Sequence, residues 1–123
     1  MHKNGLLIGA VLGLLSVVIG AFGAHGLKDI LEENGRLDVF ETAVKYQMYH
    51  AFALLFTSLL AEKINGNWAT RAIFCFVIGV LIFSGSLYVL SISNIGMFGA
   101  ITPIGGLFLI VGWVFVILGV IKN

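Results

Sequence analysis

The sequence predicts an all-α integral membrane protein, built as a four-helix bundle with one short amphipathic segment between the first two spans. The first observation is composition, because 59% of the 123 residues are hydrophobic and only 11% are charged. A soluble domain needs more charge than this to cover its surface. The second is that four apolar runs approach the roughly 20 residues that cross a bilayer. Only short polar segments separate these runs, so we expect a single transmembrane domain over residues 1–123.

The predicted spans cover residues 5–27, 42–62, 69–91 and 103–121. The first run is longer than the apolar region of a signal peptide, so we expect it to be retained as a span. Small residues recur along it at steps of three and four, which places most of them on one helical face. Such patterns let two helices approach closely. We therefore expect Gly9, Gly13 and Gly20 to pack against a neighbouring helix, from the same chain or from another copy.

Most of the charged residues lie between the first two spans, in residues 28–45. The beginning of this region predicts a short amphipathic turn on the membrane surface. Asp38 and Glu41 match a capping box, which predicts that the second long helix begins near Val39. Glu41 also lies one helical turn before Lys45, a spacing that favours an ion pair.

Residues 62–67 form a short polar segment, which predicts that spans two and three are an antiparallel hairpin. Thr102 and Pro103 predict the start of the fourth span, with threonine as the cap and proline in the first turn. Along that span glycine recurs every seven residues, which suits close contact with one neighbouring helix. The glycines concerned are Gly105, Gly112 and Gly119.

Four spans place both termini on the same side of the membrane. That side carries one more lysine or arginine than the other, so the positive-inside rule predicts cytoplasmic termini in the cell membrane. The same topology brings the end of span one, the start of span two, the end of span three and the start of span four together. The polar residues near those ends are His25, Tyr46, Tyr49, His50, Ser84, Ser86, Tyr88 and Thr102.

Two interpretations of this polar cluster stay open. The side chains could bond to one another and hold the helices together, as polar groups in membranes do. Alternatively, His25 and His50 could bind a metal, a haem iron, a quinone head group or an ion. Zinc would need further ligands, and no Cys, Asp or Glu lies at that depth. We therefore expect no metal and no cofactor.

Several function classes are disfavoured by composition. A net charge of +1 gives no reason to expect a nucleic-acid partner. The single cysteine, Cys75, allows no disulfide within the chain. Ser84 or Ser86 with His50 would be an incomplete catalytic set, because no acid is placed to orient the histidine. We therefore expect no enzymatic activity.

Four segments together resemble a known family: GAFGAHGL at 20–27, YQMYHAFALL at 46–55, FSGSLYVL at 83–90 and ITPIGGLFLIVGW at 101–113. Their order and spacing are similar to those of the small bacterial membrane proteins grouped as domain of unknown function four-twenty-three, which has small eukaryotic transmembrane relatives. The resemblance implies four helical spans in the cell membrane. Its motif positions fall on His25, His50, Ser84, Ser86, Tyr88, Thr102 and Pro103. It implies no substrate, cofactor or catalytic residue.

These patterns favour a non-enzymatic scaffold or accessory subunit that acts with lipid or with a partner membrane complex. We expect self-association through the glycine-lined faces. The alternative is an oligomeric binding or transport protein for a small molecule, quinone or ion, with its polar site near His25 and His50.

Overall fold

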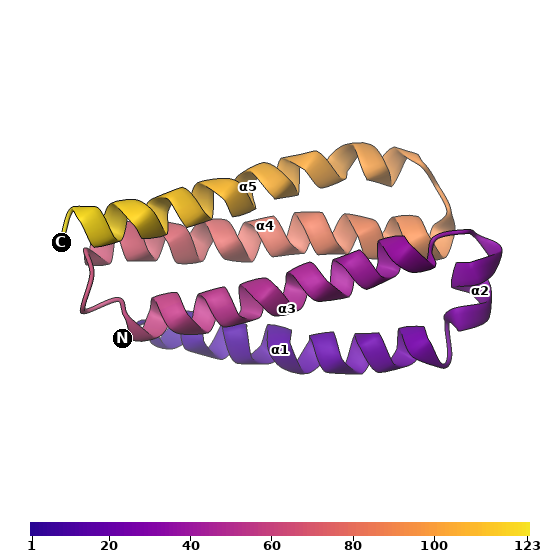
Figure 1. Cartoon of the computed structure of the whole chain (residues 1–123), viewed down its shortest axis with the longest axis horizontal. Helices are drawn as coiled ribbons and strands as arrows, with labels where there is room; N and C mark the ends of the chain where they lie inside the picture. The colour runs from indigo at the N-terminus through magenta and orange to yellow at the C-terminus, as the bar shows by residue number, and fades with distance from the viewer.

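Five helices make up the computed structural model, which describes all residues 1–123 and contains no strand. Four of the helices are long and run side by side in alternating directions, and the short α2 lies across one end of the array (Figure 1). The helices are α1 (Lys3–Ala24), α2 (Lys28–Glu33), α3 (Leu37–Leu59), α4 (Gly66–Ser93) and α5 (Met97–Ile121). The prediction of an all-α chain is confirmed.

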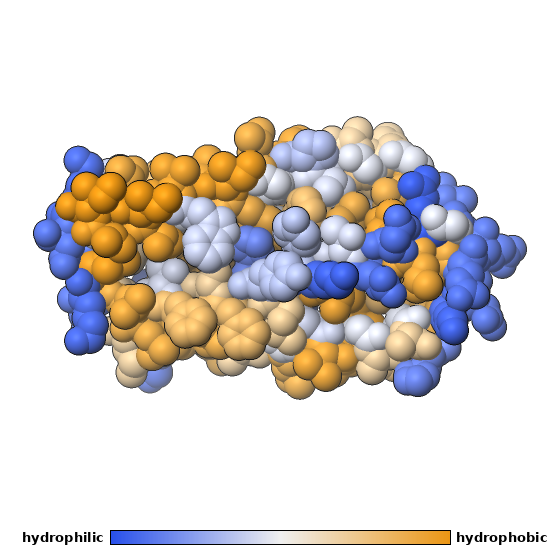
Figure 2. Space-filling model, viewed as in Figure 1, coloured by the Kyte–Doolittle hydropathy of each residue, from blue (hydrophilic) through white to orange (hydrophobic).

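Three of these helices, α1, α4 and α5, are long and apolar enough to cross a membrane. The α3 helix has sufficient length, at 23 residues, but it does not meet the same standard of apolarity. Lys45, Gln47 and His50 all lie within it. Length and composition therefore support three of the four predicted spans and leave the second one open. Hydrophilic residues gather at the two ends of the array, with a largely apolar surface between them (Figure 2).

The α3 helix packs against both α1 and α4, while α5 packs mainly against α4. The apolar core lies where these helices meet and includes Leu12, Leu54, Phe76 and Leu109, one from each long helix. This arrangement makes α3 the helix that joins the two halves of the molecule.

Close glycine contacts hold the two outer helices, and they form within the chain. A Cβ at Gly9 would lie 3.0 Å from the carbonyl oxygen of Ala51, and one at Gly20 would lie 3.4 Å from Val44. Gly13 is looser, since its Cβ would lie 3.9 Å from that of Ala51. The glycines of α5 all face α4 and the turn before it: Gly105 meets Phe83, Gly112 meets Phe76 and Gly119 meets Ile64 and Trp68. The prediction that these glycines pack against a neighbouring helix is therefore met within the chain.

The α3 helix begins at Leu37, two residues before the predicted Val39, so its start is confirmed. The predicted capping box is wrong, because the N-cap residue is Arg36, which makes no side-chain capping bond, and Asp38 lies inside the first turn. The predicted start of the last helix is also wrong. The α5 helix begins at Met97 and not at Thr102, so Pro103 lies inside it. A proline near the start of a helix removes one backbone donor. In the turn before it, the Thr102 hydroxyl contacts the Phe98 carbonyl and Ser86 of α4.

The ion pair predicted between Glu41 and Lys45 is also absent, since the only two ion pairs join Met1 to Glu62 and Lys28 to Glu32. The first of these lies at the end of the array opposite α2. There the amino group of Met1 donates to Glu62, and this hydrogen bond and charge lower the pKa of that carboxyl. The Asn123 amide donates to the Lys63 carbonyl nearby, so both termini lie at this end.

Candidate functional site

The inner face of α3 carries polar side chains that bond to all three other long helices. Gln47 is 3% exposed and donates from Nε2 to the Leu12 carbonyl of α1 over 2.9 Å. Its Oε1 accepts a 2.5 Å hydrogen bond from the Tyr88 hydroxyl of α4. Ser84 of α4 donates to the Ala43 carbonyl over 2.8 Å. The Gln47 amide therefore links three helices, because its NH₂ group bonds to α1 and its carbonyl oxygen bonds to α4.

His50 makes the link from α3 to α5. Trp113 Nε1 donates to His50 Nε2 over 3.1 Å, and His50 Nδ1 lies 2.7 Å from the Tyr46 carbonyl oxygen. An indole N–H only donates and a carbonyl only accepts, so these partners together fit the neutral Nδ1–H tautomer. Both ring nitrogens are used. In this tautomer the only ring lone pair that could bind a metal or haem iron is on Nε2, and a metal there would have to displace Trp113.

Ser86 of α4 and Thr102 of α5 form a separate pair, with their hydroxyl oxygens 2.6 Å apart. Thr102 Oγ1 also lies 3.3 Å from the Phe98 carbonyl oxygen, and Ser86 Oγ 3.0 Å from that of Phe83. Each hydroxyl has one proton, so one of them bonds to the other hydroxyl and the second bonds to its carbonyl. We call the partnered residues the inner polar layer: Gln47, His50, Ser84, Ser86, Tyr88, Thr102 and Trp113. The layer holds the helices together, and a hollow of about 170 Å³ between α1 and α4 reaches Gln47, Ser84 and Tyr88.

His25 lies apart from the inner polar layer. It is the C-cap residue of α1, and the hollow beside it is lined only by its chain neighbours Ala21, Phe22 and Gly26. Gly13 of α1 lies beside Ala51, so His25 is twelve residues beyond the level of His50. At 1.5 Å per residue this is about 18 Å along the helix. The two histidines that the sequence suggested as one site are therefore not brought together. No group of three Cys, His, Asp or Glu side chains is placed to hold a metal.

Tyr46 and Tyr49 also lie outside the layer. Their side chains are exposed, and neither hydroxyl has a hydrogen-bond partner. The Tyr46 ring packs on Phe83 at a centroid distance of 4.9 Å, and the Tyr49 ring lies 5.7 Å from that of Tyr46. The predicted cluster thus divides into a bonded interior and an exposed aromatic pair.

The exposed face of α3 has a polarity pattern of its own. Five exposed residues follow one another at steps of four, four, three and four, which places them on one helical face. They are Glu41, Lys45, Tyr49, Phe52 and Phe56, and we call them the outer stripe. A hydrophilic band enters the apolar face over α3 from the end at which α2 lies (Figure 2). Neither charge of the stripe, on Glu41 or Lys45, has an ion-pair partner.

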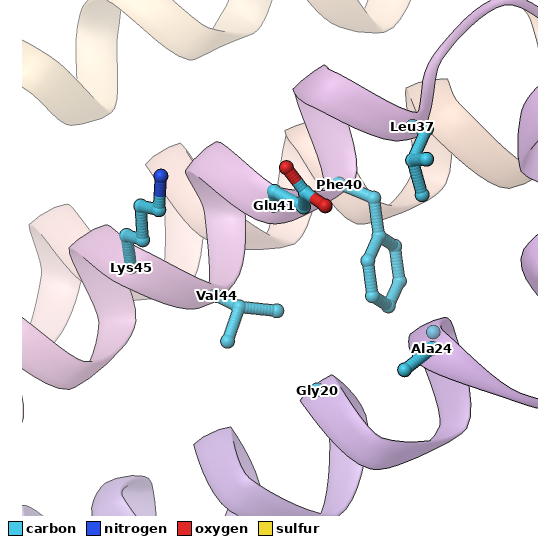
Figure 3. Close-up of a pocket in the computed structure, with 8 residues that line it drawn as sticks. Gly20, Ala24, Leu37, Phe40, Glu41, Val44 and Lys45 are labelled. Carbon is cyan, nitrogen blue, oxygen red and sulfur yellow. The ribbon is translucent and has the colours of Figure 1, made fainter.

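An apolar groove lies beside the half of the outer stripe that is farther from α2. It has a volume of about 260 Å³ and lies between α3 and α5, with Tyr49, Phe52 and Phe56 on one wall and Trp113, Val116 and Val120 on the other. A second hollow, of about 180 Å³, lies on the other side of α3, between its first turns and Gly20 and Ala24 of α1. Glu41 and Lys45 stand at the rim of this hollow (Figure 3).

Sequence reasoning missed Gln47, Trp113 and the link between the α2 end and α4. Gln47 was detectable, because an amide inside a span and on the same helical face as Ala43 and His50 needs partners. The link was not detectable. In it, Asn34 Nδ2 donates to the Ser91 and Ile92 carbonyls over 3.0 and 3.1 Å, and Arg36 Nε donates to Asn94 over 3.2 Å.

Comparison with known proteins places the chain in a family. The family model described as "Protein of unknown function (DUF423)" matches residues 19–106. The chain belongs to this DUF423 family. The matched region runs from the end of α1 to the first half of α5 and so includes nearly all of the inner polar layer. The family resemblance noted from the four sequence segments is confirmed.

Relatives named as UPF0382 membrane proteins match almost the whole chain. The UPF0382 membrane protein YwdK of Bacillus subtilis is 42% identical over 121 residues, covering 98% of both chains. The UPF0382 membrane protein SH2409 of Staphylococcus haemolyticus is 44% identical over 122 residues, covering 98% of this chain and 97% of its own. Both names describe membrane proteins. No solved structure matches the chain.

Proposed function

We propose that this DUF423 protein crosses the cell membrane four times, with both termini in the cytoplasm, and acts without catalysis as a scaffold or accessory subunit. The membrane character of its relatives and the three apolar helices support the first part. The connectivity supports the fourth crossing. Since α1 and α4 both run from the end with the termini to the α2 end, α3 must return over the same distance (Figure 1).

The polarity of α3 fits such a crossing because its polar residues are divided by face. Gln47 and His50 are buried and bonded to neighbouring helices, which satisfies them without water. In lipid, polar groups are tolerated when neighbouring helices supply their partners. The helix is therefore too polar to cross alone but suited to crossing inside this bundle.

The observation that favours a non-catalytic role is the complete use of the inner polar layer. His50 has no free nitrogen, Ser84 donates to the Ala43 carbonyl, and Ser86 is paired with Thr102. A nucleophile or general base needs a hydrogen-bonding position open to the substrate. Inside the bundle Ser58 Oγ has no hydrogen-bond partner. The charged groups without partners are on the outside, where they face lipid or another membrane protein. A role through contact at this outer surface follows.

Cysteine labelling tests the topology. In a Cys75→Ser background, single cysteines replace four exposed residues: Glu33, Lys63, Ile95 and Lys122. Intact cells are treated with a membrane-impermeant maleimide. We expect labelling at Glu33→Cys and Ile95→Cys, and protection of Lys63→Cys and Lys122→Cys until the cells are lysed. Labelling of Glu33→Cys and Lys63→Cys from the same side would contradict the α3 crossing. The fully inverted pattern would overturn only the orientation.

The absence of a redox or metal role is tested on the purified protein. We expect an absorbance spectrum of aromatic residues alone and no stoichiometric metal by elemental analysis. A Soret band, a quinone spectrum or one bound metal per chain would overturn the non-catalytic proposal. His50→Phe would then be expected to remove that signal, whereas in our account it changes stability only.

A further inference from the structure

The two ends of the bundle differ in charge. The end at which both chain termini lie, here called the terminal end, carries four basic side chains and a single acid, a net charge of +3: Lys3, Lys63, Arg71, Lys122 and Glu62. Residues 28–45 at the α2 end carry five acidic and three basic side chains, a net charge of −2. Two long helices begin and two end at the terminal end, so their dipoles offset one another there. An anionic group is therefore attracted to the terminal end.

The apolar groove between α3 and α5 leads to the terminal end. Its innermost lining residues are Tyr49, which lies near the middle of α3, and Trp113. Its last lining residues are Leu60, Ile64 and Val120, at the ends of α3 and α5. The surface over these two helices is apolar on this side, with hydrophilic residues beyond it at the terminal end (Figure 2). The groove thus runs from the middle of the bundle to its terminal end.

The length of the groove corresponds to one leaflet. Tyr49 and Leu60 are eleven residues apart, which is about 17 Å along a helix. Half of the hydrocarbon core of a bilayer is about 15 Å thick. An acyl chain that enters at the terminal end therefore reaches the middle of the bilayer within the groove.

Two lysines stand at the mouth of the groove, one beside each wall. Lys63 directly precedes Ile64, and Lys122 follows Val120 by two residues. The Asn123 side-chain amide donates to the Lys63 carbonyl over 2.8 Å, so the chain segments that carry the two lysines are tied together. Both lysines are exposed, and neither has an ion-pair partner.

The other charges of the terminal end are placed elsewhere. Lys3 begins α1, which packs on α3 and not on α5. The Arg71 guanidinium lies over the Trp68 ring, 4.6 Å from its centroid. Glu62 is paired with the amino group of Met1. Lys63 and Lys122 are therefore the free cations at the mouth.

We propose that this groove binds one phospholipid with a net negative headgroup, of the phosphatidylglycerol class, from the leaflet at the terminal end. Such a lipid presents its phosphate outermost, then the glycerol esters, then the acyl chains. The protein offers complementary groups in the same order, with Lys63 and Lys122 at the mouth and apolar walls from there to the middle of the bilayer. Basic groups beside a gap between spanning helices are suited to anionic headgroups. This inference rests on the proposed function, because it requires α3 and α5 to cross the membrane.

Other occupants fit less well. Ethanolamine and choline headgroups carry their own cation beside the phosphate, which would add a third positive charge next to Lys63 and Lys122. A second copy related by a twofold axis along the membrane normal would bring the lysines of both copies together, since such an interface uses the same patch twice. A headgroup without a cation is the occupant that matches the charge at the mouth.

Native mass spectrometry of the purified full chain tests the proposal. The protein is exposed to phosphatidylglycerol, phosphatidylethanolamine and phosphatidylcholine with identical acyl chains, and lipid adducts are counted. We expect one phosphatidylglycerol per chain, retained about five- to tenfold better than either zwitterionic lipid, which is the size of two exposed ion pairs. Lys63→Gln and Lys122→Gln should each reduce this preference, and the double variant should remove it.

Matched variants separate the groove from charge in general. Lys3→Gln removes a charge at the same end of the bundle but away from the mouth, and it should leave the preference unchanged. Val120→Trp narrows the mouth and should release the lipid whatever its headgroup. Ile117→Trp places the same side chain on α5 outside the groove lining and should leave retention unchanged. Val120 and Ile117 are 60% and 56% exposed, so neither variant disturbs the core.

Three outcomes would overturn the proposal. Equal retention of the three lipids would mean ordinary bilayer contact. An equal loss of preference in Lys3→Gln and in the single mouth variants would mean that the charge of the whole end attracts anionic lipid and that the groove does not select it. A dimer that forms without lipid and is lost in Val120→Trp would mean that a second copy covers the groove.

Cysteine labelling reports the crossing of α3 separately. A failure of lipid selectivity with the four-span labelling pattern intact would affect this inference alone.

Discussion

The two faces of α3 carry similar numbers of polar groups, but these groups differ in burial and in hydrogen-bond partners. On the inner face Gln47 and His50 are buried, and every polar atom of the two side chains has a partner on a neighbouring turn or helix. On the outer face Glu41, Lys45 and Tyr49 are exposed and have no side-chain partner. The comparison teaches that polar groups along one helix differ in whether the chain supplies their partners. The bonded groups join α3 to its neighbours, and the free groups are open to the surroundings of the bundle.

The largest effect is expected where α1 packs on the inner side of α3. Gly9→Val should lower the free energy of unfolding by about 1–3 kcal/mol, the usual cost of overpacking. A side chain there meets the Ala51 carbonyl and Leu54, which lie 3.0 and 3.1 Å from the position of a Cβ. Unfolding by denaturing detergent in mixed micelles measures it. Gly13→Ala is the matched control and should be nearly neutral, because its Cβ has 3.9 Å of room. Equal destabilisation by the two variants would contradict the packing assigned here.

Breaking the amide link on the inner face should have the next largest effect. Gln47→Leu removes the bond to the Leu12 carbonyl and leaves the Tyr88 hydroxyl without its acceptor. We expect a loss of about 1–2 kcal/mol in the same unfolding assay, since interhelical hydrogen bonds in membranes have this size. Tyr88→Phe in the Gln47→Leu background should restore part of it, because the orphaned hydroxyl is then removed. Additive losses in the double variant would show that the two side chains do not interact.

His50→Phe should cost less, about 0.6–1.7 kcal/mol. The ring keeps its packing against Phe76 and Trp113, at centroid distances of 5.6 and 5.9 Å, but Trp113 Nε1 loses its acceptor. In a Trp68→Phe background the emission of Trp113 reports the change directly, and we expect a blue shift as the indole loses its hydrogen bond. Unchanged emission would show that Trp113 does not bond to His50.

The smallest effect on stability is expected on the outer stripe. Tyr49→Phe and Lys45→Gln should each change the free energy of unfolding by less than about 0.5 kcal/mol, as exposed substitutions away from packing contacts usually do. The same unfolding assay measures both. A loss as large as that of Gln47→Leu would mean that the stripe packs against protein and does not face lipid.

The sequence was sufficient for the helical class and the family, because long apolar runs and four motifs in register are local signals. It misplaced the start of α5, since Thr102 and Pro103 form a good helix start whose hydroxyl instead bonds to Ser86 of α4. It also grouped His25 with His50 by assuming that residues near span ends lie at one depth. His50 lies thirteen residues into α3, while His25 caps α1, and only the pairing of Gly13 with Ala51 reveals the offset.

The hydrogen-bond partners within the inner polar layer could not be predicted from the sequence either. Polar residue types were recognisable one by one, yet their partners depend on helix rotation, which the sequence pattern leaves open. Gln47 faces Leu12 and Tyr88, while Lys45, two residues earlier, faces outward.

The central claim is that the two faces of α3 have separate roles, and one paired measurement tests it most directly. Gln47→Leu and Lys45→Gln are compared in the same preparations for the free energy of unfolding. The account predicts that Gln47→Leu loses about 1–2 kcal/mol, the size of interhelical hydrogen bonds in membranes, whereas Lys45→Gln changes it by less than about 0.5 kcal/mol. If the two variants lose the same stability, the two faces do not have separate roles and the account is wrong.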